Sequence, residues 1–247
     1  MFKSTHSDHE TENRKQFVRL FEQNPIPDNE KLSNLSLFMK RQDVSRFLFF
    51  NELYQKQMET NGVIFEFGVR WGTNLATFTA LRGTYEPFNY FRKIVGFDTF
   101  KGFAHVDEKD GDSEVTQVGA FGVTDGYENY LSQVLSYLEA ECPVSHIQKF
   151  ELVKGDALKT VPDYLEKHPE TIISMAYFDF DLYEPTKGCL GFIEPHLTRG
   201  SVIGFDQLNQ HYHPGETIAL HEAFGLHRFK ICKSQFSPAQ SYLVYDP

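Results

Sequence analysis

Residues 63–73 read VIFEFGVRWGT, a short apolar run followed by a turn that contains two glycines and ends in a threonine. The run Val63–Val69 has the length and composition of a buried strand. Gly68 permits a tight turn with close approach of the backbone, and Thr73 can cap a following helix whose N-terminus would face a ligand. This stretch therefore predicts a strand, a binding loop and a helix in direct succession.

The same alternation of apolar runs and helical patterns continues to the C-terminus. It favours a doubly wound α/β fold, a mostly parallel sheet with helices on both faces. The last two runs, Phe229–Lys233 and Ser241–Tyr245, are too close together for a parallel crossover and predict an antiparallel hairpin. The other predicted strands are Val63–Val69, Lys93–Asp98, Phe150–Lys154, Met175–Phe180 and Ser201–Phe205, and the predicted helices are Thr73–Arg82, Gly126–Ala140, Thr160–Lys167 and Thr186–Leu197.

Residues 1–61 depart from this pattern and predict a helical N-terminal extension in front of a domain that spans 62–247. We expect the first twelve residues to be frayed, a short helix at 13–22, and a second helix with Asp43 as its N-cap. The extension is expected to pack on the domain, with Arg41 and Arg46 on a solvated helix face. It also offers a surface for homo-oligomerisation.

Residues 101–126 form a polar, glycine-rich segment between a predicted strand and a predicted helix. The segment is longer than a typical strand–helix loop. It reads either as a disordered surface insertion or as a lid over a ligand, because it leaves directly from the end of a strand. Both readings remain open at this point.

The charge and composition of the chain exclude several classes of partner. The chain has 247 residues with 34 Asp and Glu against 24 Lys and Arg, a net charge of −10, which disfavours nucleic-acid binding. No apolar run approaches the ~20 residues of a membrane span, and the N-terminus has no secretory segment. The widely spaced Cys142, Cys189 and Cys232 are typical of a reduced protein. We therefore expect a cytoplasmic protein with no nucleic-acid or membrane partner.

Acidic residues follow the predicted parallel strands at the edge where an open sheet binds its ligands. A row of this kind predicts a strongly negative crevice that takes a cation, a ribose or both. Asp98, after the second strand, is placed to accept both hydroxyl groups of a ribose. The acidic residues of the row are Glu66, Asp98, Asp156, Asp179 with Asp181, and Asp206.

A dinucleotide site is the first alternative for such a crevice. An NAD(P)-dependent oxidoreductase is expected to carry G-x-G-x-x-G, but Arg70 stands where the second glycine would be. Tyr183 and Lys187 have the spacing of a short-chain dehydrogenase pair, yet Pro185 falls between them and is expected to begin a new helix. These features disfavour the oxidoreductase. A non-catalytic nucleoside-binding interaction module is a further alternative.

Several motifs together resemble the class I S-adenosylmethionine-dependent methyltransferases, and among them the macrocin O-methyltransferase family of sugar O-methyltransferases. The resemblance covers residues 62–247. Its most specific feature is DTFKGF at 98–103 combined with DFDLYEPT at 179–186. Other matching stretches are EFGVRWG at 66–72, KGDA at 154–157, GSVIGFD at 200–206 and the helix that follows Pro214.

The resemblance implies a seven-stranded sheet and methyl transfer from S-adenosylmethionine to a hydroxyl of a sugar or glycosylated small molecule. It also implies a divalent ion, usually Mg²⁺, held by Asp179 and Asp206, with Gln207 where the family carries a second Asp. Oxygen ligands of this kind suit Mg²⁺. The residues expected at the cofactor are Glu66, Gly68, Arg70, Gly72, Thr73, Asn74, Asp98, Thr99, Phe100, Asp156, Ala157 and Asp179.

Methyl transfer to oxygen also needs a group that removes the hydroxyl proton. His211 and His213 follow Asp206 and precede the next helix, so both are candidates for this base or for substrate contact. His211 is the nearer of the two in sequence. Asp179 and Asp181 are further catalytic candidates, as base or ligand.

Overall fold

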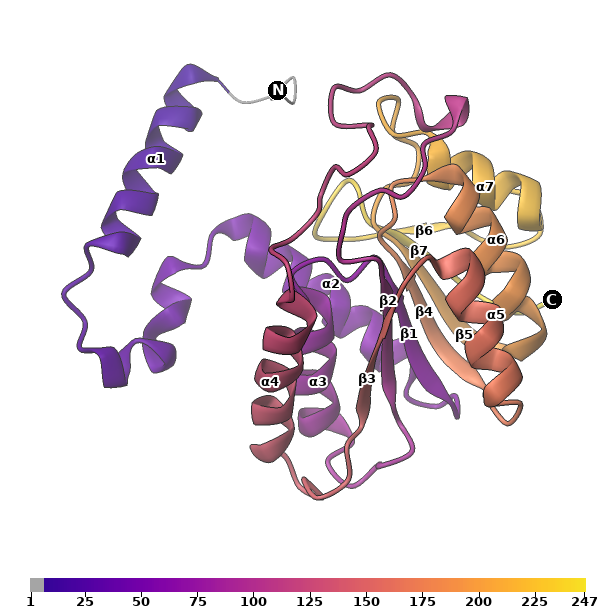
Figure 1. Cartoon of the computed structure of the whole chain (residues 1–247), viewed down its shortest axis with the longest axis horizontal. Coiled ribbons are helices and arrows are strands. Elements are labelled where there is room, and N and C mark those ends of the chain that lie inside the picture. Colours follow the sequence, from indigo (N-terminus) through magenta and orange to yellow (C-terminus); the bar gives the residue numbers. More distant parts are fainter. Residues whose placement is uncertain (1–6) are drawn as a thin grey trace.

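The computed structural model describes residues 7–247, and its centre is a seven-stranded sheet in the order β3-β2-β1-β4-β5-β7-β6 (Figure 1). Strands β1 to β5 are parallel, whereas β7 pairs antiparallel with β5 and β6 antiparallel with β7. The predicted doubly wound sheet with a C-terminal hairpin is confirmed. The strands are β1 Val63–Phe67, β2 Ile94–Asp98, β3 Phe150–Lys154, β4 Ile173–Phe178, β5 Leu197–Phe205, β6 Cys232–Lys233 and β7 Ser241–Val244.

Helices cover both faces of this sheet. The α-helices are α1 Asp8–Glu22, α2 Arg41–Gln57, α3 Thr73–Tyr85, α4 Tyr127–Ala140, α5 Ala157–Lys167, α6 Tyr183–Ile193 and α7 Gly215–Phe224, and the 3₁₀ turns are η1 Asp28–Glu30, η2 Leu32–Phe38, η3 Glu108–Asp110 and η4 Glu194–His196. Figure 1 shows α2, α3 and α4 on one face and α5, α6 and α7 on the other. Within residues 7–247 no helix is both long enough and apolar enough to cross a membrane.

Four aromatic rings stack across the middle of the sheet. Phe97, Phe67, Phe178 and Phe205 come from β2, β1, β4 and β5 respectively, and all four are fully buried. Successive ring centroids lie 5.4, 4.6 and 5.4 Å apart. Each ring belongs to the last or next-to-last residue of its strand. This close-packed row therefore gives a rigid base to the loops that follow the strands.

Within its described residues, the N-terminal extension packs on the sheet through α2 and the turn directly after it. Phe49, Phe50 and Leu53 of α2 are buried, whereas α1, η1 and η2 contain no buried residue. Figure 1 shows these three elements standing away from the sheet. The prediction that the whole extension packs on the domain is therefore wrong, and apolar side chains such as Leu32 and Leu37 are exposed.

The two N-terminal α-helices begin earlier than predicted, for local reasons. Helix α1 begins directly after Ser7, whose hydroxyl accepts from the backbone N–H of Glu10 while the Glu10 carboxylate accepts from the backbone N–H of Ser7. Residues 8–12 are therefore helical rather than frayed, and the first six residues lie outside the described part. Helix α2 begins after Lys40, whose backbone N–H donates to Asp43 at 2.9 Å, so Asp43 is not the N-cap.

Candidate active site

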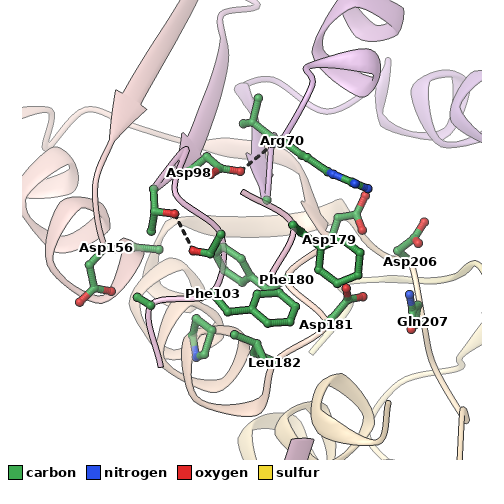
Figure 2. A pocket seen from close by; sticks show the side chains of 18 of the residues that line it. Arg70, Asp98, Phe103, Asp156, Asp179, Phe180, Asp181, Leu182, Asp206 and Gln207 are labelled. Atoms are coloured by element: carbon green, nitrogen blue, oxygen red, sulfur yellow. Dashed lines mark hydrogen bonds between the residues drawn. The ribbon is translucent and has the colours of Figure 1, made fainter. Parts of the chain in front are cut away.

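A cavity of about 540 Å³ lies at the carboxyl ends of the parallel strands, where the sequence predicts ligand binding. Figure 2 shows Asp98 and Asp156 toward one end of it and Asp179, Asp181 and Asp206 gathered at the other. The predicted site residues that line the cavity are Gly68, Arg70, Thr73, Asn74, Asp98, Thr99, Asp156, Ala157, Asp179, Asp181, Asp206, Gln207 and His213. Glu66, Gly72, Phe100 and His211 do not line it.

The turn after β1 has the backbone of a binding loop. Gly68 has a φ of +89°, and a Cβ at this position would lie 2.1 Å from the carbonyl oxygen of Asp179. Arg70 also has a positive φ, 49°, and its backbone N–H donates to Asp98 at 2.7 Å. Gly72 is the buried N-cap of α3, with a φ of 77°. The loop therefore closes tightly on the neighbouring strands β2 and β4.

Asp98 joins the loop that follows β1 to the loop that follows β2. One carboxylate oxygen accepts from the backbone N–H of Arg70, and the other accepts from that of Phe100 at 2.6 Å. Phe100 itself is buried and lies behind the cavity wall. Each carboxylate oxygen can accept more than one hydrogen bond. Asp98 can therefore organise the loops and still accept ribose hydroxyls.

Asp156 is the N-cap of α5. Its side chain accepts from the backbone N–H of Leu158 at 3.1 Å, and the helix begins at Ala157 instead of the predicted Thr160. The missed signal is the Asp itself, since Asp is among the preferred N-cap residues. This cap brings Ala157 and Leu158 into the cavity wall.

Arg46 of α2 bridges the two carboxylates that were predicted to hold a metal. Its two terminal nitrogens donate separately, one to Asp179 at 2.8 Å and one to Asp206 at 2.5 Å, and its Nε donates to Asn74 at 3.3 Å. The Arg46 side chain is 30% exposed. The prediction that Arg46 lies on a solvated helix face is therefore wrong. Sequence reasoning missed it because its two carboxylate partners lie more than a hundred residues away.

Burial raises the pKa of two carboxyl groups at this end of the cavity, Asp179 and Asp181. The pKa of Asp179 is raised to about 7, because burial and the charge of Asp206 outweigh the opposing effect of Arg46. Burial and the charges of Asp179 and Asp206 raise the pKa of Asp181 well above its usual value. Oδ1 of Asp181 has no hydrogen-bond partner among the described residues. Asp181 has a φ of 62°, a strained backbone of the kind found at functional sites.

Two buried glutamates support the site from outside the cavity wall. Glu66 of β1 is fully buried, and burial together with the charge of Asp179 raises its pKa well above the usual value. Glu216 of α7 accepts from the backbone N–H groups of Asp181 at 3.3 Å and Gln207 at 3.1 Å, so it ties the loops after β4 and β5 together. Sequence reasoning gave Glu216 no role, because an acidic residue in the first turn of a helix is common.

The two candidate histidines occupy different environments. His213 lines the cavity and is buried, whereas His211 is exposed and packs its ring against Tyr212. Burial lowers the pKa of His213, so its ring is neutral near pH 7 and can accept a proton. Of these two, His213, the more distant from Asp206 in sequence, is the one that lines the cavity.

Residues 101–126 fold over the cavity. The backbone N–H of Phe103 donates to the carbonyl of Ala120 at 3.0 Å and joins the two arms of the segment. The rings of Phe103 and Phe121 meet edge to face at 5.2 Å, and the Arg70 guanidinium lies 4.9 Å from the Phe121 ring. Both rings line the cavity. This arrangement favours a lid over a disordered insertion.

Tyr183 and Lys187 share one helix face, contrary to the prediction from Pro185. Helix α6 begins at Tyr183 rather than Thr186, and Lys187 donates to the Tyr183 hydroxyl at 2.9 Å. That hydroxyl donates in turn to Glu222 of α7 at 2.6 Å, and neither member of the pair lines the cavity. The pair braces α6 against α7 and does not form a dehydrogenase site.

The donor atoms at the acidic end suit a hard divalent cation. Asp179 and Asp206 supply carboxylate oxygens, and the amide oxygen of Gln207 is buried with no hydrogen-bond partner among the described residues. An all-oxygen set of this kind matches the preference of Mg²⁺. In the part of the chain that the structure describes, no three His, Cys, Asp or Glu side chains converge as a metal site. An ion here would therefore draw further ligands from Gln207, water or substrate.

The chain is similar over nearly its whole length to solved methyltransferase structures, although no protein-family model and no curated protein matches it. A structure of CalS11, a calicheamicin methyltransferase, is 43% identical with a TM-score of 0.95, and the match covers 98% of this chain and 95% of that one. An apo structure of CalS11, described as a TDP-rhamnose 3'-O-methyltransferase of calicheamicin biosynthesis, is 41% identical with a TM-score of 0.86, covering 98% and 96%. The O-methyltransferase NovP shares the fold at 14% identity and a TM-score of 0.60, over 83% and 81%.

Proposed function

The chain belongs to the class I S-adenosylmethionine-dependent methyltransferases, among the sugar O-methyltransferases, and we propose that its acceptor is a hydroxyl group of a nucleotide-activated sugar. The support is a relative, 41% identical over nearly its full length, that is a TDP-rhamnose 3'-O-methyltransferase. Membership of this family excludes the two alternative functions, an oxidoreductase and a non-catalytic interaction module.

One cavity with two chemically distinct ends supports this function. At one end, Asp98 and the glycine turn at Gly68 suit a nucleoside. At the other end, Asp179, Asp181 and Asp206 form a polar wall that suits a hydroxylated acceptor. The volume of about 540 Å³ lies within the range of small-molecule sites. A methyl group carried between the two ends would face the acceptor oxygen.

In this proposal the cofactor lies along the loops after β1, β2 and β3. Asp98 accepts the ribose hydroxyls, and Asp156 and Ala157 border the adenine. The turn from Gly68 to Asn74 borders the methionine portion of the cofactor. Three further residues fix the conformation of these loops without lining the cavity, namely Glu66, Gly72 and Phe100.

The chain must then place an oxygen in line with the methyl group and remove its proton. A sulfonium methyl is already an activated electrophile, so positioning and proton removal are the remaining tasks. His213 is the first candidate for the base and Asp181 the second. Asp179, Asp206 and Gln207 would hold a Mg²⁺ ion, which lowers the pKa of a bound hydroxyl and orients it.

We also propose that the chain forms a homo-oligomer through its N-terminal arm, residues 8–48. Large apolar side chains along this arm are exposed, among them Leu20, Leu32, Leu37 and Phe47. Exposed large apolar side chains gathered along one segment are candidates for burial at an interface between subunits. Sedimentation equilibrium tests this assignment, and a monomer at micromolar concentration would contradict it.

Methyl transfer to a defined sugar nucleotide tests the proposed function. Purified chain would be incubated with S-adenosylmethionine and either TDP-rhamnose or free rhamnose. We expect S-adenosylhomocysteine and a singly methylated sugar nucleotide, with little product from the free sugar. Turnover of glycosides but of no sugar nucleotide would contradict the proposed acceptor class. Calorimetry should show binding of S-adenosylmethionine and none of NAD.

A further inference from the structure

Arg46 lies where a cation between Asp179 and Asp206 would lie. Its planar guanidinium directs one terminal nitrogen to each carboxylate, at 2.8 and 2.5 Å, and so spans the pair as a fork. The guanidinium also lies 5.1 Å from the centre of the Phe50 ring on the same helix. Since the Arg46 side chain is 30% exposed, it has a path to solvent. The bridge can therefore open without unfolding α2.

More carboxyl groups lie around Arg46 than one guanidinium can pair with. Asp179, Asp206, Asp181, Glu66 and Glu216 act on one another electrostatically, and Arg46 is the one cation bonded to any of them within residues 7–247. A divalent ion would supply one more positive charge than Arg46 does.

The second carboxylate is held in position independently of Arg46. The Tyr177 hydroxyl donates to Oδ1 of Asp206 at 2.7 Å, and Gln240 donates to the same oxygen at 3.0 Å. Asp206 would therefore keep its orientation if Arg46 moved away. A cation can be bound in the space between the two carboxylates. A guanidinium and a small ion cannot occupy that space together.

We propose that Arg46 is a built-in competitor for the divalent ion: it bridges Asp179 and Asp206 when no ion is bound and leaves the pair when an ion binds. This inference rests on the proposed metal site of the methyltransferase. Arg46 lowers the affinity of the site for the ion. When no ion is bound, its positive charge offsets the repulsion between the two carboxylates. Because Arg46 belongs to α2, loading of the ion is coupled to the N-terminal extension.

Metal binding measured without methyl transfer tests this inference. Mn²⁺ would be titrated into the full chain by calorimetry, for the wild type, Arg46→Met and Arg46→Lys. We expect Arg46→Met to bind Mn²⁺ at least about tenfold more tightly, within the roughly 5–150-fold range of coupled equilibria, and Arg46→Lys to be intermediate. Arg41→Met is the matched control, since Arg41 lies exposed on the same helix, and it should match the wild type.

Thermal unfolding separates competition from a merely structural role. Arg46→Met should lower the midpoint of unfolding in EDTA, and saturating Mn²⁺ should remove most of that difference. Equal losses with and without Mn²⁺, unchanged or weaker Mn²⁺ affinity in Arg46→Met, or no Mn²⁺ binding to either protein would overturn the inference. If Arg46→Met does not fold, Arg46→Lys must still bind Mn²⁺ more tightly than the wild type. The acceptor is tested separately, because failure to methylate TDP-rhamnose does not alter these binding results.

Discussion

Asp110 accepts a hydrogen bond from the backbone N–H of Tyr183 at 2.5 Å, so the segment that covers the cavity is fastened to the first residue of α6. Asp110 is 1% exposed. Its neighbour Lys109 pairs with Glu222 of α7 at 2.8 Å. The loop that bears Asp179 and Asp181 leads directly into α6. The covering segment is thus anchored to the same helix that positions the acidic end of the cavity.

The first prediction concerns this anchor. Asp110→Ala removes the acceptor for the first N–H of α6, and loss of such a cap typically costs about 1 kcal/mol. We expect a lower unfolding midpoint and faster protease cleavage within residues 101–126. In the wild type, S-adenosylhomocysteine should slow that cleavage, and the variant should lose most of this protection. Asp112→Ala, an exposed change in the same segment, serves as the control. Equal cleavage with and without S-adenosylhomocysteine in the wild type would argue against a lid.

The second prediction concerns the turn after β1. Gly68→Ala places a Cβ 2.1 Å from the Asp179 carbonyl oxygen at a φ of +89°, so the turn must shift. We expect a loss of about 1–3 kcal/mol of stability and impaired binding of S-adenosylmethionine, measured by thermal unfolding and calorimetry. Gly191→Ala in α6 is the matched control, because a Cβ there meets no atom of residues 7–247 within 4 Å. A Gly68→Ala variant with normal cofactor affinity would show that the turn does not contact the cofactor.

The sheet could be predicted from the sequence because its strands are apolar runs bounded by glycine and acidic residues. The predicted β3 matches the observed Phe150–Lys154 at both ends. The predicted strand Phe229–Lys233 is shorter in the structure, Cys232–Lys233, since Phe229 packs its ring against Phe224 and Tyr245 in the core. An apolar run alone does not distinguish core packing from strand pairing.

The acidic end of the cavity was predictable only in part. Asp179 and Asp206 follow adjacent parallel strands, and this topology places them side by side. The role of Arg46 depends instead on how α2 packs on the sheet, which local sequence does not encode. Asp181, whose φ is positive, likewise donates its backbone N–H to Glu216 of α7, a contact that local sequence does not encode. Long-range contacts of this kind complete the site.

The third prediction concerns Asp98. If this carboxylate accepts the ribose hydroxyls, Asp98→Ala should weaken the binding of S-adenosylhomocysteine by about 1.5–3 kcal/mol, the usual value of a hydrogen bond to a charged group. Asp98→Asn should lose less, because it keeps one acceptor oxygen. Calorimetry gives the affinities, and the emission of Trp71, the one tryptophan of the chain and part of the cavity wall, gives an independent signal. Unchanged affinity in a folded Asp98→Ala variant would place the ribose elsewhere.

The fourth prediction concerns the metal. We expect EDTA to reduce methyl transfer sharply and Mg²⁺ to restore it, because an ion at Asp179 and Asp206 would activate the acceptor hydroxyl. The chain should stay folded in EDTA, since Arg46 bridges the carboxylates. Asp206→Asn should lose activity but keep most of its affinity for S-adenosylhomocysteine, because we expect this ligand to bind at the other end of the cavity. Full turnover in EDTA would remove the metal from the mechanism.

The last prediction separates the two histidines. His213 lines the cavity and His211 does not, so His213→Gln should reduce kcat by about 10²–10⁴-fold, the usual contribution of a general base. His211→Gln should stay close to the wild type. Protonation disables a base, so activity should fall as the pH drops through the pKa of His213. Burial lowers that pKa below the ordinary value of 6.5, so the fall should lie below pH 6.5 and disappear in His213→Gln. If His213→Gln kept both its rate and its loss of activity at low pH, proton removal would be assigned to Asp181. This residue lines the same cavity, and its buried Oδ1 has no hydrogen-bond partner among residues 7–247.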